Sequence, residues 1–135
     1  KMVKTPTYHV FEMFTPHHNA QALPLTITTE NWTRDKYTLP SVDASASKDI
    51  DGVLNISLVN LHPADEQKIV IDVRGLAVKG FGIKGKILAG NSLDQHNTFE
   101  NPDNLIPQNF TGISSEGTKI SVTLPARSVS MLEVK

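Results

Sequence analysis

The sequence predicts an all-β domain, an antiparallel β-sandwich preceded by one short N-terminal helix. From residue 25 onward valine, isoleucine and threonine dominate, apolar and polar residues alternate, and turn-forming residues recur at short intervals. A proline-capped helical pattern occurs once, at the start of the chain. The 135 residues suffice for one domain with a real core, and they are too few for a complete (β/α)₈ barrel.

The predicted helix begins at Thr5, whose side chain is suited to cap it, and Pro6 takes the first helical position. The pair Thr15-Pro16 ends the pattern. The apolar residues of this segment, at roughly helical spacing, are Tyr8, Val10, Phe11 and Phe14. Because so short a helix is marginal in water, we expect its aromatic side to pack on the rest of the chain or on a neighbour that this sequence does not contain.

The strands are predicted at residues 25–33, 42–48, 53–60, 67–73, 84–88, 119–124 and 129–134. Three of them alternate most clearly, with apolar residues at every second position: Leu54, Ile56 and Leu58; Ile69, Ile71 and Val73; Ile120, Val122 and Leu124. Each set should turn one apolar side into the core.

The connections between these strands carry turn chemistry. Residues 49–52 indicate a hairpin turn, since Gly52 tolerates a positive φ and the aspartates before it can bond the turn backbone. Pro125 lacks an amide donor, which suits a bend between two strands. The stretch 90–117 is polar, contains two prolines and is long for an idle connection. We expect it to be functional, to cover a neighbouring surface or to be disordered.

Composition removes several classes of function. Thirteen basic residues face fourteen acidic ones, giving a formal charge of -1, so no basic field exists that would gather nucleic acid or an anionic membrane surface. No stretch approaches the roughly 20 apolar residues of a membrane-spanning helix. The absence of cysteine removes disulfides, thiolate metal sites and a cysteine nucleophile, and it leaves the compartment undetermined.

Short motifs for cofactors and metals fail on their context. Residues 80–85 match G-x-G-x-x-G, but the chain continues there as a strand, whereas a dinucleotide site needs a helix. Ser47, Asp49 and Asp51 resemble the front of a calcium loop that lacks its closing glutamate. The five histidines show no metal-binding spacing, and we expect them at the surface or at an interface. We therefore predict no cofactor and no metal site.

Spacing alone assigns no catalytic residue. Acid/base catalysis needs two facing carboxylates, and the candidates show no pairing: Glu12, Glu30, Asp94 and Glu100. Trp32 with Tyr37 is the candidate aromatic platform for a sugar ring, in a chain of only 6% aromatic residues. The alternative for this pair is a rim cluster that covers the core.

Four segments carry a family resemblance: TPTYHVFEMF (5–14), ISLVNL (56–61), DQHNTFENP (94–102) and VTLPARSV (122–129). In this order they resemble the C-terminal region of the α-L-arabinofuranosidases of glycoside hydrolase family 51. The likeness runs over nearly the whole chain and is weakest between residues 21 and 43.

The resemblance implies a parent enzyme in which a catalytic (β/α)₈ barrel precedes a jelly-roll-like β-sandwich. By this analogy, residues 1–19 are the end of the barrel with its linker, and residues 20–135 are the C-terminal sandwich domain. The family removes terminal α-L-arabinofuranosyl groups from arabinan and arabinoxylan with retention of configuration, using two glutamates at the ends of barrel strands. Neither glutamate matches a position in this chain, which implies a fragment without activity of its own.

The resemblance also gives a role to the polar loop, residues 94–107, within the stretch 90–117. We expect it to contact the barrel, with interface residues His96, Asn97, Phe99 and Glu100. The chain is then a non-catalytic accessory domain whose partner is the barrel of the same parent, and the parent can form a homo-oligomer. Two alternatives stay open: an autonomous carbohydrate-binding module that uses Trp32 and Tyr37, and a purely structural oligomerisation domain.

Overall fold

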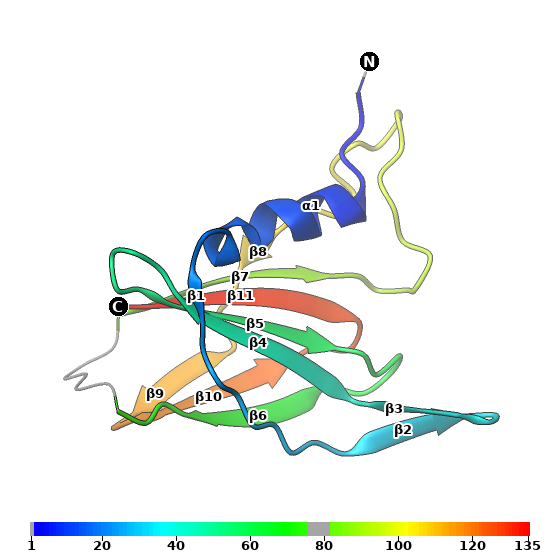
Figure 1. The fold of residues 1–135 in the computed structure, drawn as a ribbon. Helices are drawn as coiled ribbons and strands as arrows, with labels where there is room; N and C mark the ends of the chain where they lie inside the picture. Colours follow the sequence, from blue (N-terminus) through cyan, green and yellow to red (C-terminus); the bar gives the residue numbers. More distant parts are fainter. Residues whose placement is uncertain (1, 76–81) are drawn as a thin grey trace.

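The computed structural model describes residues 2–75 and 82–135. A large and a small antiparallel sheet pack face to face, and one helix lies on the outer face of the large sheet (Figure 1). The helix α1 (Pro6–Met13) and the 3₁₀ turn η1 (Thr15–His17) come first. The strands are β1 (Gln21–Ala22), β2 (Asn31–Arg34), β3 (Tyr37–Pro40), β4 (Val42–Lys48), β5 (Leu54–Asn60), β6 (Gln67–Asp72), β7 (Ile83–Ala89), β8 (Gln108–Asn109), β9 (Ile113–Glu116), β10 (Lys119–Leu124) and β11 (Ser128–Val134). The predicted all-β sandwich with one short N-terminal helix is confirmed.

Strand pairing joins distant parts of the sequence. The large sheet has the order β1-β4-β5-β11-β7-β8 and the small sheet the order β6-β10-β9. The last strand, β11, lies inside the large sheet, where residues 128–134 pair with residues 54–60 of β5 and residues 83–89 of β7. The strands β2 and β3 pair with each other as a separate hairpin, residues 31–40, which we call the arm.

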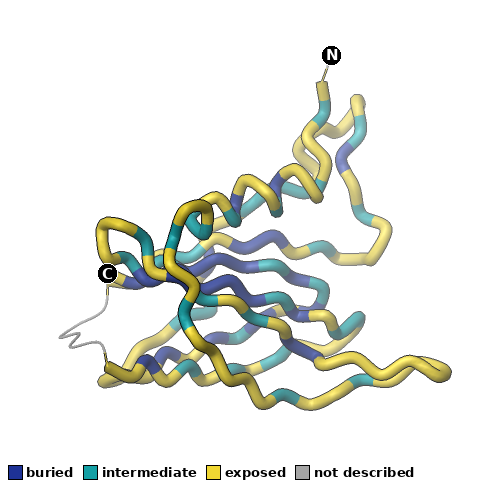
Figure 2. Tube along the Cα trace, in the orientation of Figure 1, coloured by how far each residue is buried: buried dark blue, intermediate teal, exposed yellow. Residues whose placement is uncertain are grey.

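The core lies between the two sheets, where the three predicted alternating sets meet. Leu58 and Leu132 of the large sheet are at most 1% exposed, and Ile120 and Leu124 of the small sheet are fully buried. The apolar side chains of β6 pack against the same cluster. Figure 2 shows the buried positions following the strands of both sheets, whereas the arm is largely exposed. The predicted inward faces of β5, β6 and β10 are confirmed.

Local sequence accounts for the helix. The Thr5 hydroxyl accepts a hydrogen bond from the Tyr8 amide at 3.1 Å, and the proline after Thr5 is the first helical residue, as predicted. Met13 is 5% exposed and packs with Leu88 and Met131 on the outer face of the large sheet. The large sheet therefore has two apolar sides, one for the sandwich core and one for the helix.

Two sequence predictions are wrong in detail. The strand predicted at 25–33 is absent over residues 25–30, where Leu25 and Ile27 are 42% and 37% exposed. Their alternation reflects an extended segment that pairs with no strand among residues 2–75 and 82–135; pairing begins only at Asn31. The polar stretch 90–117 contains the short strands β8 and β9, whose mostly exposed residues leave no alternating apolar pattern.

A glycine of the G-x-G-x-x-G motif serves packing. Gly80 and Phe81 lie outside the described residues, but Gly85 lies in β7, which continues as a strand, as predicted. A Cβ atom on Gly85 would lie 2.6 Å from Ile113 Cδ1 and 3.1 Å from Leu132 Cδ2. The position is small because the core crowds it.

Gly85→Ala should therefore lower the free energy of unfolding by about 1–3 kcal/mol, the usual cost of forcing an extra carbon into a packed core. Urea unfolding measures the change. Gly82→Ala is the matched control, because a Cβ atom there meets nothing within 4 Å. Equal stability of the two variants would contradict the packing explanation.

The turn η1 is fastened to the large sheet by His17. Its Nδ1 lies 2.6 Å from Ser47 Oγ of β4, and its Nε2 lies 3.0 Å from Ser57 Oγ of β5. Burial lowers the pKa of His17, because the charged ring loses hydration. The ring is therefore neutral near pH 7, with one nitrogen donating and the other accepting, so that it bridges two strands.

This bridge should make stability depend on pH. The folded-state pKa lies below the unfolded value of about 6.5, so the stabilisation from neutral His17 is complete above that value and is lost as pH falls through the folded pKa. His17→Gln keeps an amide for the serines but does not titrate, so its free energy of unfolding should fall less between about pH 7 and pH 5. Urea unfolding at stepped pH tests this, with exposed His18→Gln as the control that keeps the original slope. The same slope in His17→Gln would refute the assignment.

Candidate functional site

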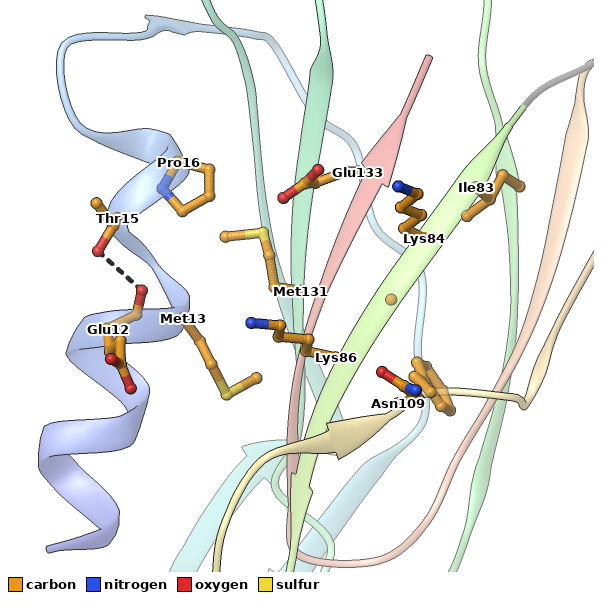
Figure 3. Close-up of a pocket in the computed structure, with 12 residues that line it drawn as sticks. Glu12, Met13, Thr15, Pro16, Ile83, Lys84, Lys86, Asn109, Met131 and Glu133 are labelled. Carbon is orange, nitrogen blue, oxygen red and sulfur yellow. Dashed lines mark hydrogen bonds between the residues drawn. The ribbon is translucent and has the colours of Figure 1, made fainter. Parts of the chain in front are cut away.

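A groove of about 680 Å³ separates α1 from the strands β7, β8 and β11 (Figure 3). Its charged residues are Glu12, Lys84, Lys86 and Glu133, and its apolar residues include Met13, Pro16 and Met131. Glu133 is the direct cross-strand neighbour of Lys84. Because two carboxylates balance two ammonium groups, the groove carries no net formal charge and favours neither an anion nor a cation.

A second groove, of about 930 Å³, lies between residues 24–28 and strand β6. Core side chains such as Ile56 and Ile69 form its floor. Asp72 at its edge is held by Arg74, whose Nε donates to Asp72 Oδ2 at 2.9 Å. The groove therefore runs along an edge strand of the sandwich, and its lining residues form no acid/base pair.

The carboxylates considered for acid/base catalysis lie on three separate segments. Glu12 is on α1, Glu30 precedes β2, and Asp94 and Glu100 are in the polar loop. A hydrogen bond from the Ser92 hydroxyl lowers the pKa of Asp94, which makes this group a poorer proton donor at neutral pH. No catalytic role follows for any of them.

Neither a metal site nor a membrane-spanning helix is found in the described residues. The described residues contain no group of three or more histidine, aspartate or glutamate side chains arranged to hold a metal ion. His9 is 5% exposed and differs from the expectation of a surface position; its Nδ1 lies 3.6 Å from Glu12 Oε2. In the described ranges, no helix has the length and apolar character needed to cross a bilayer.

The loop predicted to contact a barrel runs beside the N-terminal end of α1 (Figure 1). Asn97 fastens it: its Nδ2 donates to Lys4 O at 2.8 Å and to Leu105 O at 2.9 Å, while its Oδ1 accepts from the Leu105 amide at 2.6 Å. Asn97 is only 9% exposed, so it holds the loop in place. This role of Asn97 was not predictable from the sequence, because a single buried amide in a polar loop has no periodic pattern.

The other three predicted interface residues lie at the surface of the same loop. His96 Nδ1 contacts Asp94 O at 2.7 Å, and Phe99 is 53% exposed. Glu100 is exposed as well. The exposed apolar residues of α1 and of residues 91–107 together are Tyr8, Phe11, Leu93 and Phe99. We call these two elements the helix–loop face.

The arm brings together the two residues predicted as a sugar platform. In its register Trp32 is opposite Leu39 and Arg34 is opposite Tyr37, so all four side chains share one face. Tyr37 is 66% exposed, whereas Trp32 is half-buried and its ring meets His62 edge-on, with 6.0 Å between ring centres. Leu39 and Arg34 were missed, because only the pairing register reveals that they belong to this face.

Comparison with known proteins gives this fold a family. The family described as the α-L-arabinofuranosidase C-terminal domain matches residues 1–128. An intracellular exo-α-L-arabinofuranosidase of Bacteroides ovatus is 38% identical over 100% of this chain and 26% of the relative. An α-L-arabinofuranosidase of Arabidopsis thaliana is 31% identical over 96% of this chain and 18% of the relative.

Solved structures agree. The family 51 arabinofuranosidase of Xanthomonas axonopodis pv. citri superposes with a TM-score of 0.95 and 35% identity, over 100% of this chain and 27% of that one. The α-L-arabinofuranosidase of Thermotoga maritima gives 0.79 and 27%, over 96% and 28%. This chain spans about a quarter of the length of these structures and of the Bacteroides enzyme. The resemblance of its four segments is confirmed: the chain belongs to the C-terminal domain family of the family 51 α-L-arabinofuranosidases.

Proposed function

We propose that this chain works as the non-catalytic accessory sandwich of a longer α-L-arabinofuranosidase, in which the helix–loop face packs against the catalytic (β/α)₈ barrel. On this proposal residues 1–19 form the junction to the barrel and residues 20–135 the accessory domain. The observation that supports this proposal most strongly is that helix α1 has apolar residues on two opposite sides.

One side of α1 is already covered. Met13 is buried against the large sheet, and Val10 and Phe14 pack around it. On the same helix Phe11 is 76% and Tyr8 is 45% exposed. A helix that is apolar on both sides is typical of one buried between two bodies. The large sheet supplies one body, and a second body would remove the aromatic rings from water.

The neighbouring loop extends the same face. Asn97 ties the loop to the backbone of Lys4, directly before α1, so loop and helix are held together. Phe99 and Leu93 add exposed apolar surface, at 53% and 75%. Burying one such side chain fully contributes about 1.5–3 kcal/mol, so a few of them suffice to hold two domains of one chain together.

The parent reaction is proposed from the family. The Bacteroides relative is named as an exo-enzyme for α-L-arabinofuranosides, and about three quarters of its length lies outside the match. Two catalytic glutamates on barrel strands would belong to that part. The carboxylates of the groove, Glu12 and Glu133, stand beside Lys84 and two methionines, an arrangement that fits packing against another domain.

The first test is enzymatic. The purified 135-residue chain should release no arabinose from an aryl α-L-arabinofuranoside, because it supplies neither catalytic glutamate. Release of the aryl group is followed by absorbance, with the longer enzyme as positive control. Hydrolysis by the chain at a rate similar to that of the longer enzyme would overturn the accessory role.

The second test addresses the interface. In the longer enzyme Phe11→Ser should lower the free energy of unfolding by about 1–3 kcal/mol, because a buried ring is removed. In the 135-residue chain the same change should have little effect, because Phe11 is exposed there. Val70→Ser is the matched control, since Val70 is 64% exposed on β6 of the small sheet.

Calorimetry measures both chains, and kcat/KM well below the melting temperature should stay unchanged in the longer enzyme. A longer enzyme whose melting is insensitive to Phe11→Ser would place the barrel on another face.

A further inference from the structure

The arm is joined to the sandwich at its base. Its strands pair with each other and with no other strand in the described part of the chain. At the base, the Ser41 amide donates to Glu30 O and Ser41 O accepts from the Leu61 amide, both at 2.8 Å. Figure 1 shows the hairpin projecting from the sandwich beyond this point. Because a two-stranded hairpin is marginally stable by itself, the position of the arm depends on the side chains that contact its base.

A contact between the Trp32 and His62 rings holds the arm against the sandwich. The rings meet edge-on with 6.0 Å between their centres, and the His62 backbone is fixed because its amide donates to the buried Asn60 Oδ1 at 2.9 Å. The indole Nε1 of Trp32 is buried and has no hydrogen-bond partner among the described residues. Burying a donor without a partner costs free energy, which exposure to water would recover. The closed position of the arm therefore contains an unfavourable contribution that opening would remove.

The hydrogen bonds of the His62 ring define its protonation state. Nδ1 accepts from the backbone amides of Ala64 at 3.2 Å and of Asp65 at 2.8 Å. A ring nitrogen that accepts carries no proton, so the proton of the neutral ring is on Nε2, which lies 3.3 Å from Asp65 Oδ2. In the charged ring Nδ1 would also carry a proton, directed at two amide N–H groups. The observed conformation of residues 62–65 therefore suits the neutral ring and conflicts with the charged one.

The charged groups around His62 leave this conflict in place. The Asp65 carboxylate is 72% exposed, so its attraction for a charged ring is weakened by water and does not replace two lost hydrogen bonds. Arg127 donates its amide to His62 O at 3.2 Å and its guanidinium to Pro63 O, which brings a positive charge to the same loop. The charged side chains on the elements packed around the ring are Asp65 and Glu66 from its own loop, Arg127 from the connection before β11, and Arg34 from the contacting face of the arm.

We propose that protonation of His62 releases the arm, so that the hairpin is closed on the sandwich at neutral pH and open in mildly acidic solution. Histidine is the side chain that ordinarily changes charge in this range of pH. The charged ring loses both amide hydrogen bonds, residues 62–65 rearrange, and the edge-on contact with Trp32 is lost. The arm then swings about its base at Ser41, where the backbone hydrogen bonds do not titrate. Opening brings the indole Nε1 into water.

This transition is separate from the pH effect expected for His17. The His17 ring bridges two strands of the large sheet, so its protonation changes the free energy of unfolding of the sandwich. The buried core cluster and the residues packed on it include none of the arm residues 31–40. Opening of the arm should therefore leave both sheets folded, and it should be visible at Trp32 while the secondary structure is unchanged.

Fluorescence of Trp32, the single tryptophan of the 135-residue chain, tests the proposal. Between about pH 7 and pH 5 its emission should shift to longer wavelength, and the rate constant of its quenching by acrylamide should rise at least about twofold, because the half-buried indole enters water. Far-UV circular dichroism should stay the same over this range. An unchanged acrylamide quenching constant would overturn the proposal even if the intensity falls, because a charged imidazole can quench an indole that it still contacts.

Two variants separate the hydrogen bonds of His62 from its ring. In His62→Asn a side-chain oxygen that does not titrate can accept from the same two amides, so acrylamide quenching should no longer depend on pH. In His62→Phe the ring remains but the loop has no acceptor, so quenching should already be high at neutral pH. His17→Gln and His18→Gln are the matched controls and should keep the full transition. A transition that persists in His62→Asn, or a closed arm in His62→Phe, would contradict the mechanism.

Hydrogen exchange measured by NMR gives a direct readout of the loop. After correction for the intrinsic exchange rate, the protection of the Ala64 and Asp65 amides should fall at least severalfold as the solution is acidified, while the Leu132 amide inside the large sheet stays protected. Equal protection of the two loop amides at both pH values would refute the release of the arm. That result would leave the accessory role unaffected, since that role is tested by interdomain melting.

Discussion

The position of β11 inside the large sheet is the constraint on which the rest of the fold depends. Its inward residues Leu132 and Val134 are 0% and 3% exposed and form part of the sandwich core. Met131, directly before Leu132, points the other way and packs with Met13 of α1. Because successive side chains of a strand point to opposite faces, one register sets both contacts, and a slip of one residue would lose both.

One buried side-chain amide, that of Asn60, holds the connection by which the chain passes from the small sheet to the large sheet. Asn60, at the end of β5 and 2% exposed, donates from Nδ2 to Leu124 O at 3.1 Å and to Pro125 O at 3.0 Å, where the chain leaves the small sheet. Its Oδ1 accepts from the His62 amide at 2.9 Å. His62 in turn contacts the Trp32 ring. The Asn60 amide that joins the two sheets therefore also positions the base of the arm at Trp32.

The sequence predicted correctly the strands in which apolar and polar residues alternate and whose apolar side packs on another apolar surface. Strands β4 and β10 have the predicted bounds, because apolar and polar residues alternate without interruption there. Alternation at Leu25 and Ile27 predicted a strand, but this segment pairs with no strand in the part of the chain that the structure describes, since an extended chain and a paired strand share one period. The site was predictable only in part: residue types pointed to Trp32 and Tyr37, while the pairing register added Arg34 and Leu39.

The helix–loop face and the arm lie on different sides of the large sheet. The chain can therefore act by holding other domains in place. The helix–loop face is held on the outer side by Met131, and the arm is held by His62 at the end of the strand that pairs with β11. If the barrel occupies the helix–loop face, that contact leaves the arm uncovered. The stiffness of the sandwich between them then matters more than any reactive group on it, which agrees with a core of fully buried aliphatic side chains and with carboxylates that share their groove with lysines.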